Sequence, residues 1–159
     1  MPPGETLSDP AAFVERLEKG KRLIGLDLGT RTIGVALSDV TRMIASSFET
    51  VMRTKFTADA ARLMEIAAEQ GVGGVVIGLP RNLDGSEGPR VQSTRAFSRN
   101  FNRLSPLPLL LWDERLSTVA AERMLIEADR SRKRRAEVID KVAATIILQS
   151  ALDRMRGIG

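Results

Sequence analysis

Two nearly all-apolar runs, residues 73–79 and 107–112, most constrain the fold of this chain. Each has the length of one strand, and the segments 56–70 and 91–104 beside them place apolar residues at helical spacing. A strand that is apolar on both faces must be covered on both sides, as in parallel strands sandwiched between helices. The pattern therefore predicts an α/β protein with a helix-covered sheet.

Three more strands are expected earlier in the chain. Arg22 to Leu28 and Ile33 to Leu37 are joined by the tight turn Gly29-Thr30-Arg31, and Met43 to Met52 follows. Because these segments are closely linked, they predict an antiparallel meander at one side of the sheet. With the two apolar runs, the expected architecture is a five-stranded mixed sheet, three antiparallel strands and then parallel ones, with helices on both faces.

Both ends of the chain are expected to be largely helical. Residues 1–20 are interpreted as an N-terminal extension, in which Ser8-Asp9-Pro10 begins a short helix through Glu18. Residues 21–159 then form one domain, a usual size for a single core. The order predicted for its last part is a helix from Ser117 to about Ala128, a basic loop from Arg130 to Arg135, and a helix from about Ala136 to Met155.

The residues that are missing limit the chemistry. The 159 residues include no Cys and no His, which excludes disulfides, thiol nucleophiles, Ser-His-Asp triads and the usual zinc ligands. A site of carboxylates alone suits a hard cation, Mg²⁺ or Mn²⁺. No apolar run approaches the roughly 20 residues of a membrane span, and the first twenty residues do not follow the order of a secretory signal. We therefore expect a soluble cytoplasmic protein with no membrane partner.

Charge is unevenly distributed along the chain. Residues 1–89 contain ten Lys and Arg against twelve Asp and Glu, whereas residues 90–159 contain fourteen against eight. A basic face for nucleic-acid phosphates explains this excess, and so does a need for solubility. The run from Arg130 to Arg135 is open to the same two explanations.

Asp27 is the first candidate for a functional carboxylate. It lies within an otherwise apolar strand, where an acid needs a metal ion or hydrogen-bond donors to offset its burial. Gly29, which follows it, lets the backbone approach a ligand closely. The alternative is an Asp at a strand end that is bonded to its own hairpin turn.

Two further candidate segments follow the two apolar strands. The loop Pro80 to Pro89 is rich in turn formers, and Asp113-Glu114-Arg115 comes directly after the second strand. The carboxyl ends of strands are where open α/β sheets bind ligands. The alternative for the loop is an ordinary strand-to-helix connection. The alternative for Asp113-Glu114-Arg115 is a solvated helix N-terminus, where acids are favoured.

Asp140 is the last candidate. In the final helix it shares a stripe with Ala144, Ile147 and Ala151, which favours a carboxylate that faces the protein. The alternative is a position at the surface, because Asp140 is one turn from Glu137 and beside Lys141.

Taken in series, these segments resemble the YqgF (RuvX) family of RNase H-like nucleases over about residues 21–155. The matching residues are Asp27, Gly29, Arg31 and Gly34 with Ser38-Asp39, then Gly78-Leu79-Pro80 with Asp84-Gly85, then Asp113 to Thr118, and finally Asp140 leading into Ala143-Ala144 and Ile146-Ile147-Leu148. The resemblance implies an RNase H-like fold and an RNase H-like nuclease domain over residues 21–159.

The resemblance also implies roles for particular residues. Asp27, Glu114 and Asp140 would be catalytic and would meet around one or two Mg²⁺ or Mn²⁺ ions, with Asp113 as the alternative to Glu114. The residues expected at substrate phosphates are Arg31, Asn82, Arg115 and Ser117.

Two activities are implied by the family. The first is processing of the 5′ end of precursor 16S ribosomal RNA, and the other is Holliday-junction resolution. The expected partners are structured RNA, branched DNA and ribosomal precursor particles, with the protein acting as a monomer or as a homodimer. The single Trp and the absence of Tyr favour recognition by backbone shape over base stacking.

Two other classes of protein are alternatives. Asp27-Leu28-Gly29-Thr30 also resembles the first phosphate motif of the actin, Hsp70 and sugar-kinase superfamily, whose members need two such domains. A non-catalytic nucleic-acid-binding module on the same fold is the other alternative. It would gain nothing from acids near phosphates, which disfavours it.

Overall fold

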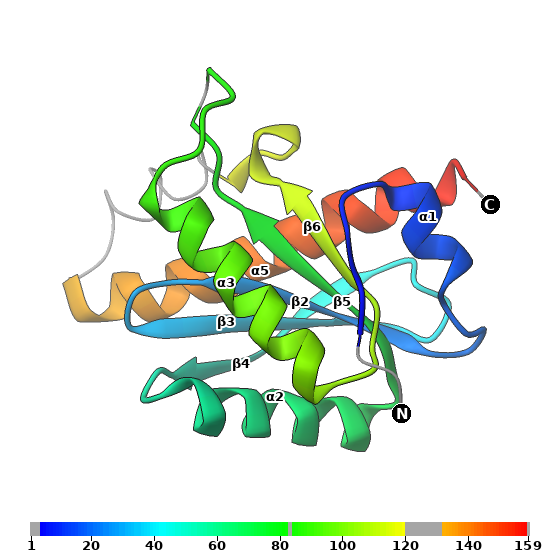
Figure 1. The fold of residues 1–159 in the computed structure, drawn as a ribbon, viewed down its shortest axis with the longest axis horizontal. Helices are drawn as coiled ribbons and strands as arrows, with labels where there is room; N and C mark the ends of the chain where they lie inside the picture. The colour runs from blue at the N-terminus through cyan, green and yellow to red at the C-terminus, as the bar shows by residue number, and fades with distance from the viewer. Residues whose placement is uncertain (1–3, 83, 120–131, 159) are drawn as a thin grey trace.

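A six-stranded mixed sheet forms the centre of the molecule, in the order β1-β6-β5-β2-β3-β4 (Figure 1). The computed structural model describes residues 4–82, 84–119 and 132–158, and the side chains of residues 132–140 lie outside that description. The strands are β1 (Thr6–Leu7), β2 (Arg22–Leu28), β3 (Thr32–Ser38), β4 (Ala45–Met52), β5 (Val72–Leu79) and β6 (Leu109–Asp113). The helices are α1 (Pro10–Glu15), α2 (Phe56–Gln70), α3 (Pro89–Leu104), the 3₁₀ helix η1 (Glu114–Leu116) and α5 (Arg132–Arg156).

The strand directions agree with the predicted mixed sheet. Strands β2, β3 and β4 form the antiparallel meander, and β5 and β6 continue parallel to β2. The sixth strand, β1, was not predicted; it pairs parallel with β6 at the edge of the sheet. Its two residues are too short a run for alternation to reveal a strand.

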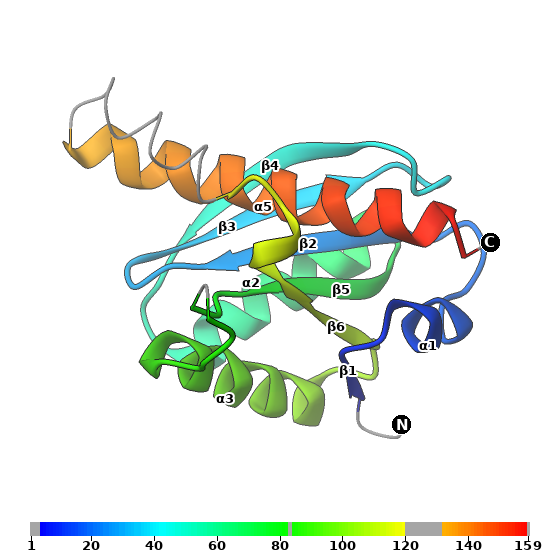
Figure 2. The ribbon, with the colours of Figure 1, turned by 90° about the horizontal axis from the view of Figure 1, so that it is seen from above.

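Helices cover both faces of the sheet (Figures 1 and 2). Helices α2 and α3 lie on one face, over a core that includes Ile24, Leu26 and Phe97. Helix α5 lies on the other face, over a core that includes Leu23 and Val76. Because successive residues of a strand point to opposite faces, Asp27 belongs to the α5 face.

Helix α5 lies close to the sheet because glycines face it. A Cβ added at Gly25 would lie 2.7 Å from the Cβ of Leu148 and 3.2 Å from the carbonyl oxygen of Ala144. Gln149 and Thr145 hydrogen-bond the start of β4, at the backbone N–H of Ala45 and the hydroxyl of Ser47 respectively. The helix therefore runs antiparallel to β4 and β2.

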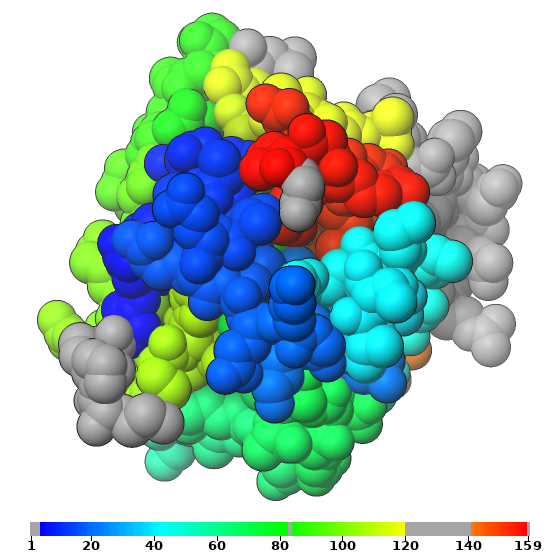
Figure 3. Space-filling model, turned by 90° about the vertical axis from the view of Figure 1, so that its right-hand side faces the viewer, coloured from blue at the N-terminus to red at the C-terminus, as the bar shows by residue number. Residues whose placement is uncertain are grey.

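The N-terminal segment contributes to the sheet and the core. The side chain of Asp9 accepts a hydrogen bond from the N–H of Ala11 at 3.3 Å and caps α1, which ends at Glu15 rather than at Glu18. Phe13 is fully buried against the α5 core. Figure 3 shows α1 beside the C-terminal end of α5.

Two expectations about the last part of the chain have different outcomes. Helix α5 begins at Arg132, so residues 132–135 are helical and the predicted basic loop is wrong over this range. Arg and Lys are good helix formers, and residues 132–135 include no Gly or Pro that would end a helix. Beyond Val119, the helix predicted from Ser117 to about Ala128 lies outside the described residues. None of the helices within the described ranges is long and apolar enough to cross a bilayer.

Candidate active site

Asp27 and Glu114 lie at the same edge of the sheet. Asp27 is near the C-terminal end of β2 and is 2% exposed, while Glu114 follows β6 and is 8% exposed. Strands β2 and β6 flank β5 and run parallel to it, so their carboxyl ends meet at one edge. Burial of two carboxylates at this edge is costly, so a positive charge or hydrogen-bond donors must offset their desolvation.

Gly78 makes room for Glu114 beside Asp27. In the β2–β5 register Leu26 pairs with Ile77, so the next position places Asp27 beside Gly78. A Cβ added at Gly78 would lie 3.2 Å from the Cγ of Glu114 and 2.5 Å from the Cδ1 of Ile147. The side chain of Glu114 therefore lies over Gly78, on the α5 face of the sheet, and Asp27 is on the neighbouring strand of that same face.

Residue 140 lies in α5 at the same end of the sheet. Gly25 packs against the helical turn from Ala144 to Leu148, and residue 140 is one turn before Ala144, about 6 Å along the helix axis. Two residues of β2, from Gly25 to Asp27, span about 7 Å in the same direction. Position 140 thus lies toward the Asp27 end of β2, whereas its side chain lies outside the described residues. Among the described side chains no group of three acids could hold a metal ion, so the predicted trio with Asp140 stays a prediction.

Two arginines far away in the sequence hold the turn after Asp27. Arg53 Nη1 donates to the carbonyl oxygen of Gly29 at 2.7 Å, and Arg90 Nη2 donates to that of Leu28 at 3.2 Å. The N–H of Arg53 also donates to the carbonyl oxygen of Arg31 at 2.9 Å, while the side chain of Arg31 is exposed at the turn. No local sequence pattern indicates either arginine's role, because these contacts join separate elements.

Asp113 and Glu114 have different environments although they are adjacent. The carboxylate of Asp113 accepts hydrogen bonds from Arg115, at 2.9 Å from its backbone N–H, 3.1 Å from Nε and 2.7 Å from Nη2. These bonds from Arg115 lower the pKa of Asp113, since they stabilise the carboxylate form. Asp113 thus forms an ion pair at the rim, and Glu114 is the buried acid on the α5 face.

The loop after β5 brings Asn82 and Arg115 close together. Asn82 Nδ2 donates to Ser86 Oγ at 2.9 Å, and the Ser86 hydroxyl donates to Asp84 Oδ1 at 2.6 Å. The hydrogen bonds from Ser86 lower the pKa of Asp84. Gly85 adopts a φ of 88°, and a Cβ added there would lie 3.2 Å from Arg115 Nη1. Two predicted substrate-binding residues therefore lie at one loop beside the carboxylates.

Ser117 hydrogen-bonds the backbone of Glu114. Its hydroxyl donates to the carbonyl oxygen of Glu114 at 2.9 Å, and its N–H donates to the same oxygen at 3.2 Å. These bonds close the single turn of η1 and fix the backbone that carries Glu114. In this arrangement Ser117 has a structural contact in addition to its predicted role at the substrate.

The sheet order and the paired carboxylates at its edge define an RNase H-like protein. Among solved structures, the chain is similar to T. thermophilus RuvC in complex with a Holliday junction substrate, with a TM-score of 0.54, 12% identity, and coverage of 86% of this chain and 96% of that chain. A second Thermus thermophilus RuvC structure gives a TM-score of 0.52 at 13% identity, covering 86% and 97%. At such identities the likeness concerns the fold alone, and it confirms the predicted fold class.

The family follows from closer relatives. The model described as "RuvX: Holliday junction resolvase" matches residues 21–154, and the chain belongs to this family. A protein of Cereibacter sphaeroides is 65% identical over 147 residues, 92% of each chain. One of Paracoccus denitrificans is 63% identical over 147 residues, 92% of this chain and 93% of the relative. Both relatives carry the name "Putative pre-16S rRNA nuclease".

Proposed function

We propose that the protein is a metal-dependent endonuclease that hydrolyses phosphodiester bonds in structured nucleic acid, and that its substrate is the 5′ end of precursor 16S ribosomal RNA. The observation that carries the proposal is the pair of buried carboxylates, Asp27 and Glu114, on one face of the sheet edge around Gly78. The names of the relatives that match 92% of the chain support the ribosomal substrate. This role belongs in the cytoplasm, where ribosomes are assembled.

The donor set fits Mg²⁺ or Mn²⁺. The chain contains no His and no Cys, and the two described acids are almost fully buried, which suits a hard cation bound by oxygen. Because Gly78 has no side chain, Glu114 can pack directly on the strand next to the one that carries Asp27. Asp27, Glu114 and, as the proposed third ligand, Asp140 would hold the ion. When bound, it would supply an activated water and charge stabilisation for the leaving oxygen.

Residues of the chain itself would position the substrate. Arg31 and Arg115 are exposed beside the carboxylates, and Arg115 is held by Asp113 in one orientation. A guanidinium that is fixed in this way meets a phosphate without losing further rotamer freedom. We assign Arg31, Asn82, Arg115 and Ser117 to the path of the nucleic-acid backbone, with Asp113 as the residue that orients Arg115.

Cleavage of branched DNA is the second candidate function. The description of the matching family, Holliday junction resolvase, favours it. A four-way junction has twofold symmetry, so this role calls for a homodimer, whereas RNA trimming, free or within a ribosomal precursor particle, needs only a monomer.

The test uses two labelled substrates, a precursor 16S RNA fragment and a four-way DNA junction, with Mg²⁺ or Mn²⁺ and with a chelator as control. We expect metal-dependent cutting of the RNA that is lost in Asp27→Asn. Asp153→Asn, which removes an exposed acid of α5, is the matched control and should cut normally. Preferred cutting of the junction would replace the ribosomal role with the recombination role. Firm binding without cutting of either substrate would identify a non-catalytic binding module.

A further inference from the structure

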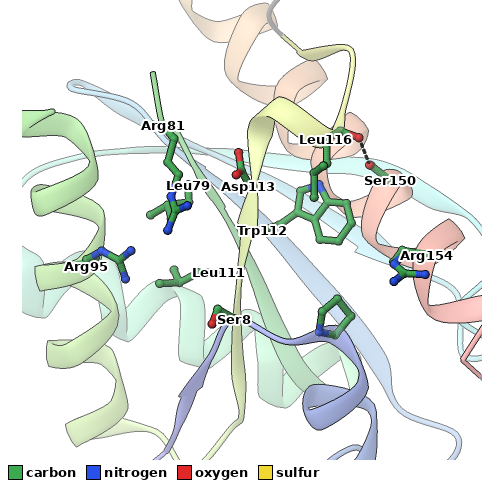
Figure 4. Close-up of a pocket in the computed structure, with 11 residues that line it drawn as sticks. Ser8, Leu79, Arg81, Arg95, Leu111, Trp112, Asp113, Leu116, Ser150 and Arg154 are labelled. Atoms are coloured by element: carbon green, nitrogen blue, oxygen red, sulfur yellow. Dashed lines mark hydrogen bonds between the residues drawn. The ribbon is translucent and has the colours of Figure 1, made fainter. Parts of the chain in front are cut away.

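A groove of about 670 Å³ opens at the edge of β6, next to the candidate active site (Figure 4). We name it the β6-edge groove. Its walls carry Arg81 and Arg95 on the α3 side and Arg154 on the α5 side, and its floor includes Leu79, Leu111 and Trp112. The proposed metal ligands Asp27 and Glu114 do not line it, so this groove is a separate feature.

The short β1 explains why the groove exists. Strand β1 pairs only with Leu109 and Leu110, and the chain then leaves the sheet edge through Ser8 to form α1. Within the described residues, no strand covers the outer edge of β6 from Leu111 to Asp113. The space beyond this edge, between α3 and α5, is the groove.

The charges of the groove favour an anion. Arg81 and Arg95 share one carboxylate, that of Glu87, at 3.3 Å and 2.7 Å. Arg154, on the opposite wall, makes no side-chain hydrogen bond or ion pair to any described residue. Asp113 at the rim is neutralised by Arg115. Three guanidinium groups thus face the groove with one shared counter-charge between two of them.

Two buried donors in the groove lining find no acceptor. They are Arg81 Nε and Trp112 Nε1. A buried polar atom without a hydrogen-bond partner is rare in a folded protein and needs an explanation. Because both orphaned atoms are donors, the missing partner is a group rich in acceptors. Leu116, which is 66% exposed, lines the same groove as the indole of Trp112 (Figure 4).

The floor of the groove favours a ligand with a flat apolar body. Leu79, Leu111 and Trp112 are each less than a tenth exposed; the two leucines line the groove from the α3 face of the sheet and Trp112 lines it from the α5 face. The volume of about 670 Å³ lies within the range of roughly 300–1,000 Å³ of small-molecule sites. An inorganic anion would leave most of this apolar surface uncovered.

We infer that the β6-edge groove binds one nucleotide, with its phosphate between Arg81 and Arg154 and its base on the leucine floor. The ligand chemistry is that of a nucleoside 5′-phosphate, either free or as one unit of a strand. Guanidinium groups bind phosphate oxygens through paired hydrogen bonds, and a base offers the acceptors that the orphaned donors lack. Asp113 at the rim directly precedes Glu114, so a nucleotide here continues the substrate path. This last step rests on the proposed nuclease function.

The experiment uses Trp112 as its reporter, since it is the only Trp of the chain. The ¹⁵N-labelled full-length protein is titrated in a chelator, without divalent metal, and its single indole N–H signal is followed by NMR. The probes are uridine 5′-monophosphate, a six-residue oligouridylate, inorganic phosphate and a polyglutamate peptide. We expect a saturable shift with the two nucleotide probes. Tighter binding of the oligonucleotide would assign the site to a strand, and tighter binding of the monophosphate to a free nucleotide.

Two arginine variants separate the groove from general attraction by charge. Arg154→Ala removes the unshared guanidinium, and we expect it to weaken nucleotide binding by about tenfold, as for the loss of one charge-assisted hydrogen bond. Arg103→Ala changes the net charge equally at an exposed position of α3 outside the groove, and should leave the affinity unchanged. Equal weakening by both variants would overturn the proposal.

Other outcomes would overturn it as well. An indole signal that does not move with either nucleotide, an equal response to inorganic phosphate, or a response to polyglutamate alone would exclude a nucleotide site. Because the titration contains no metal and needs no cleavage, it reports on the groove alone. A protein that binds nucleotide in the groove but cuts neither nucleic-acid substrate would contradict the nuclease function. A protein that cuts but binds no nucleotide in the groove would contradict only the groove proposal.

Discussion

Glu114 and Gly78 are packed against each other, since a methyl group at position 78 would lie 3.2 Å from the Cγ of Glu114. The same methyl would lie 2.5 Å from the Cδ1 of Ile147. Gly78→Ala therefore displaces Glu114, α5 or both. We expect a loss of about 1–3 kcal/mol in the free energy of unfolding, as for overpacked cores. A misplacement of about 1 Å at the carboxylate lowers the cleavage rate by about 10²-fold.

Urea unfolding and single-turnover cleavage measure the two effects of Gly78→Ala separately. The control is Gly157→Ala, at a position where the nearest neighbouring atom would lie 3.6 Å from the added Cβ. A Gly78→Ala protein that is as stable and active as the control would show that Glu114 does not depend on this space.

Substitution of the two adjacent acids should give unequal results. Glu114→Gln removes a proposed metal ligand, so we expect the cleavage rate to fall by about 10³-fold or more, the equivalent of about 4 kcal/mol in the barrier. Asp113→Asn weakens the ion pair with Arg115, and the rate should fall by about tenfold or less. Cleavage rates at increasing Mn²⁺ concentration test this, because only the loss of a ligand raises the metal concentration required. If Asp113→Asn were the more damaging change, Asp113 would be the ligand.

Arg53 is expected to act by positioning the turn that follows Asp27. Arg53→Lys keeps the charge and loses the guanidinium geometry that reaches the carbonyl oxygen of Gly29 at 2.7 Å. We expect about a tenfold lower kcat, with unchanged affinity for the RNA measured in a chelator. Arg62→Lys is the matched control, because Arg62 pairs with Glu49 and Glu65 away from this turn. An equal decrease in both variants would assign the effect to general destabilisation.

Much of the fold could be predicted because its signals are local. The apolar runs that became β5 and β6 and the turn at Gly29 lie within single stretches of sequence. The place of Asp27 near a strand end follows from the same stretches. Strand β1 was missed, since its two residues are ordered by pairing with Leu109 and Leu110 and not by their own pattern.

The local sequence pattern does not indicate that Glu114 rather than Asp113 is buried on the α5 face, because this burial depends on contacts across the sheet. Both faces of β6 are apolar, so alternation along Leu111 and Trp112 does not reveal which face α5 covers. The register that places Gly78 beside Asp27 joins residues about fifty positions apart. The roles of Arg53 and Arg90 are hidden for the same reason.

The Ser38-Asp39 pair of the family motif stabilises the end of the β3 strand. Ser38 Oγ accepts a hydrogen bond from the N–H of Leu23 at 2.8 Å, which ties β3 to β2. The carboxylate of Asp39 accepts bonds from the hydroxyl of Thr41 and from the N–H groups of Met43 and Ile44. Sequence alone could not separate this role in the β3–β4 connection from one in catalysis.

Stability should depend on pH through Asp39. The hydrogen bond from the Thr41 hydroxyl and those from the backbone N–H groups of Ile44 and Met43 lower the pKa of Asp39 from 3.8 to about 2. Because the folded protein binds the proton less tightly, this stabilisation is present above about pH 4 and is lost as the pH falls toward 2. In urea unfolding, Asp39→Asn should be less stable than wild type by about 1 kcal/mol at pH 7, a value reduced for solvent exposure. The difference should shrink between pH 4 and pH 2, and a constant difference over this range would contradict the assignment.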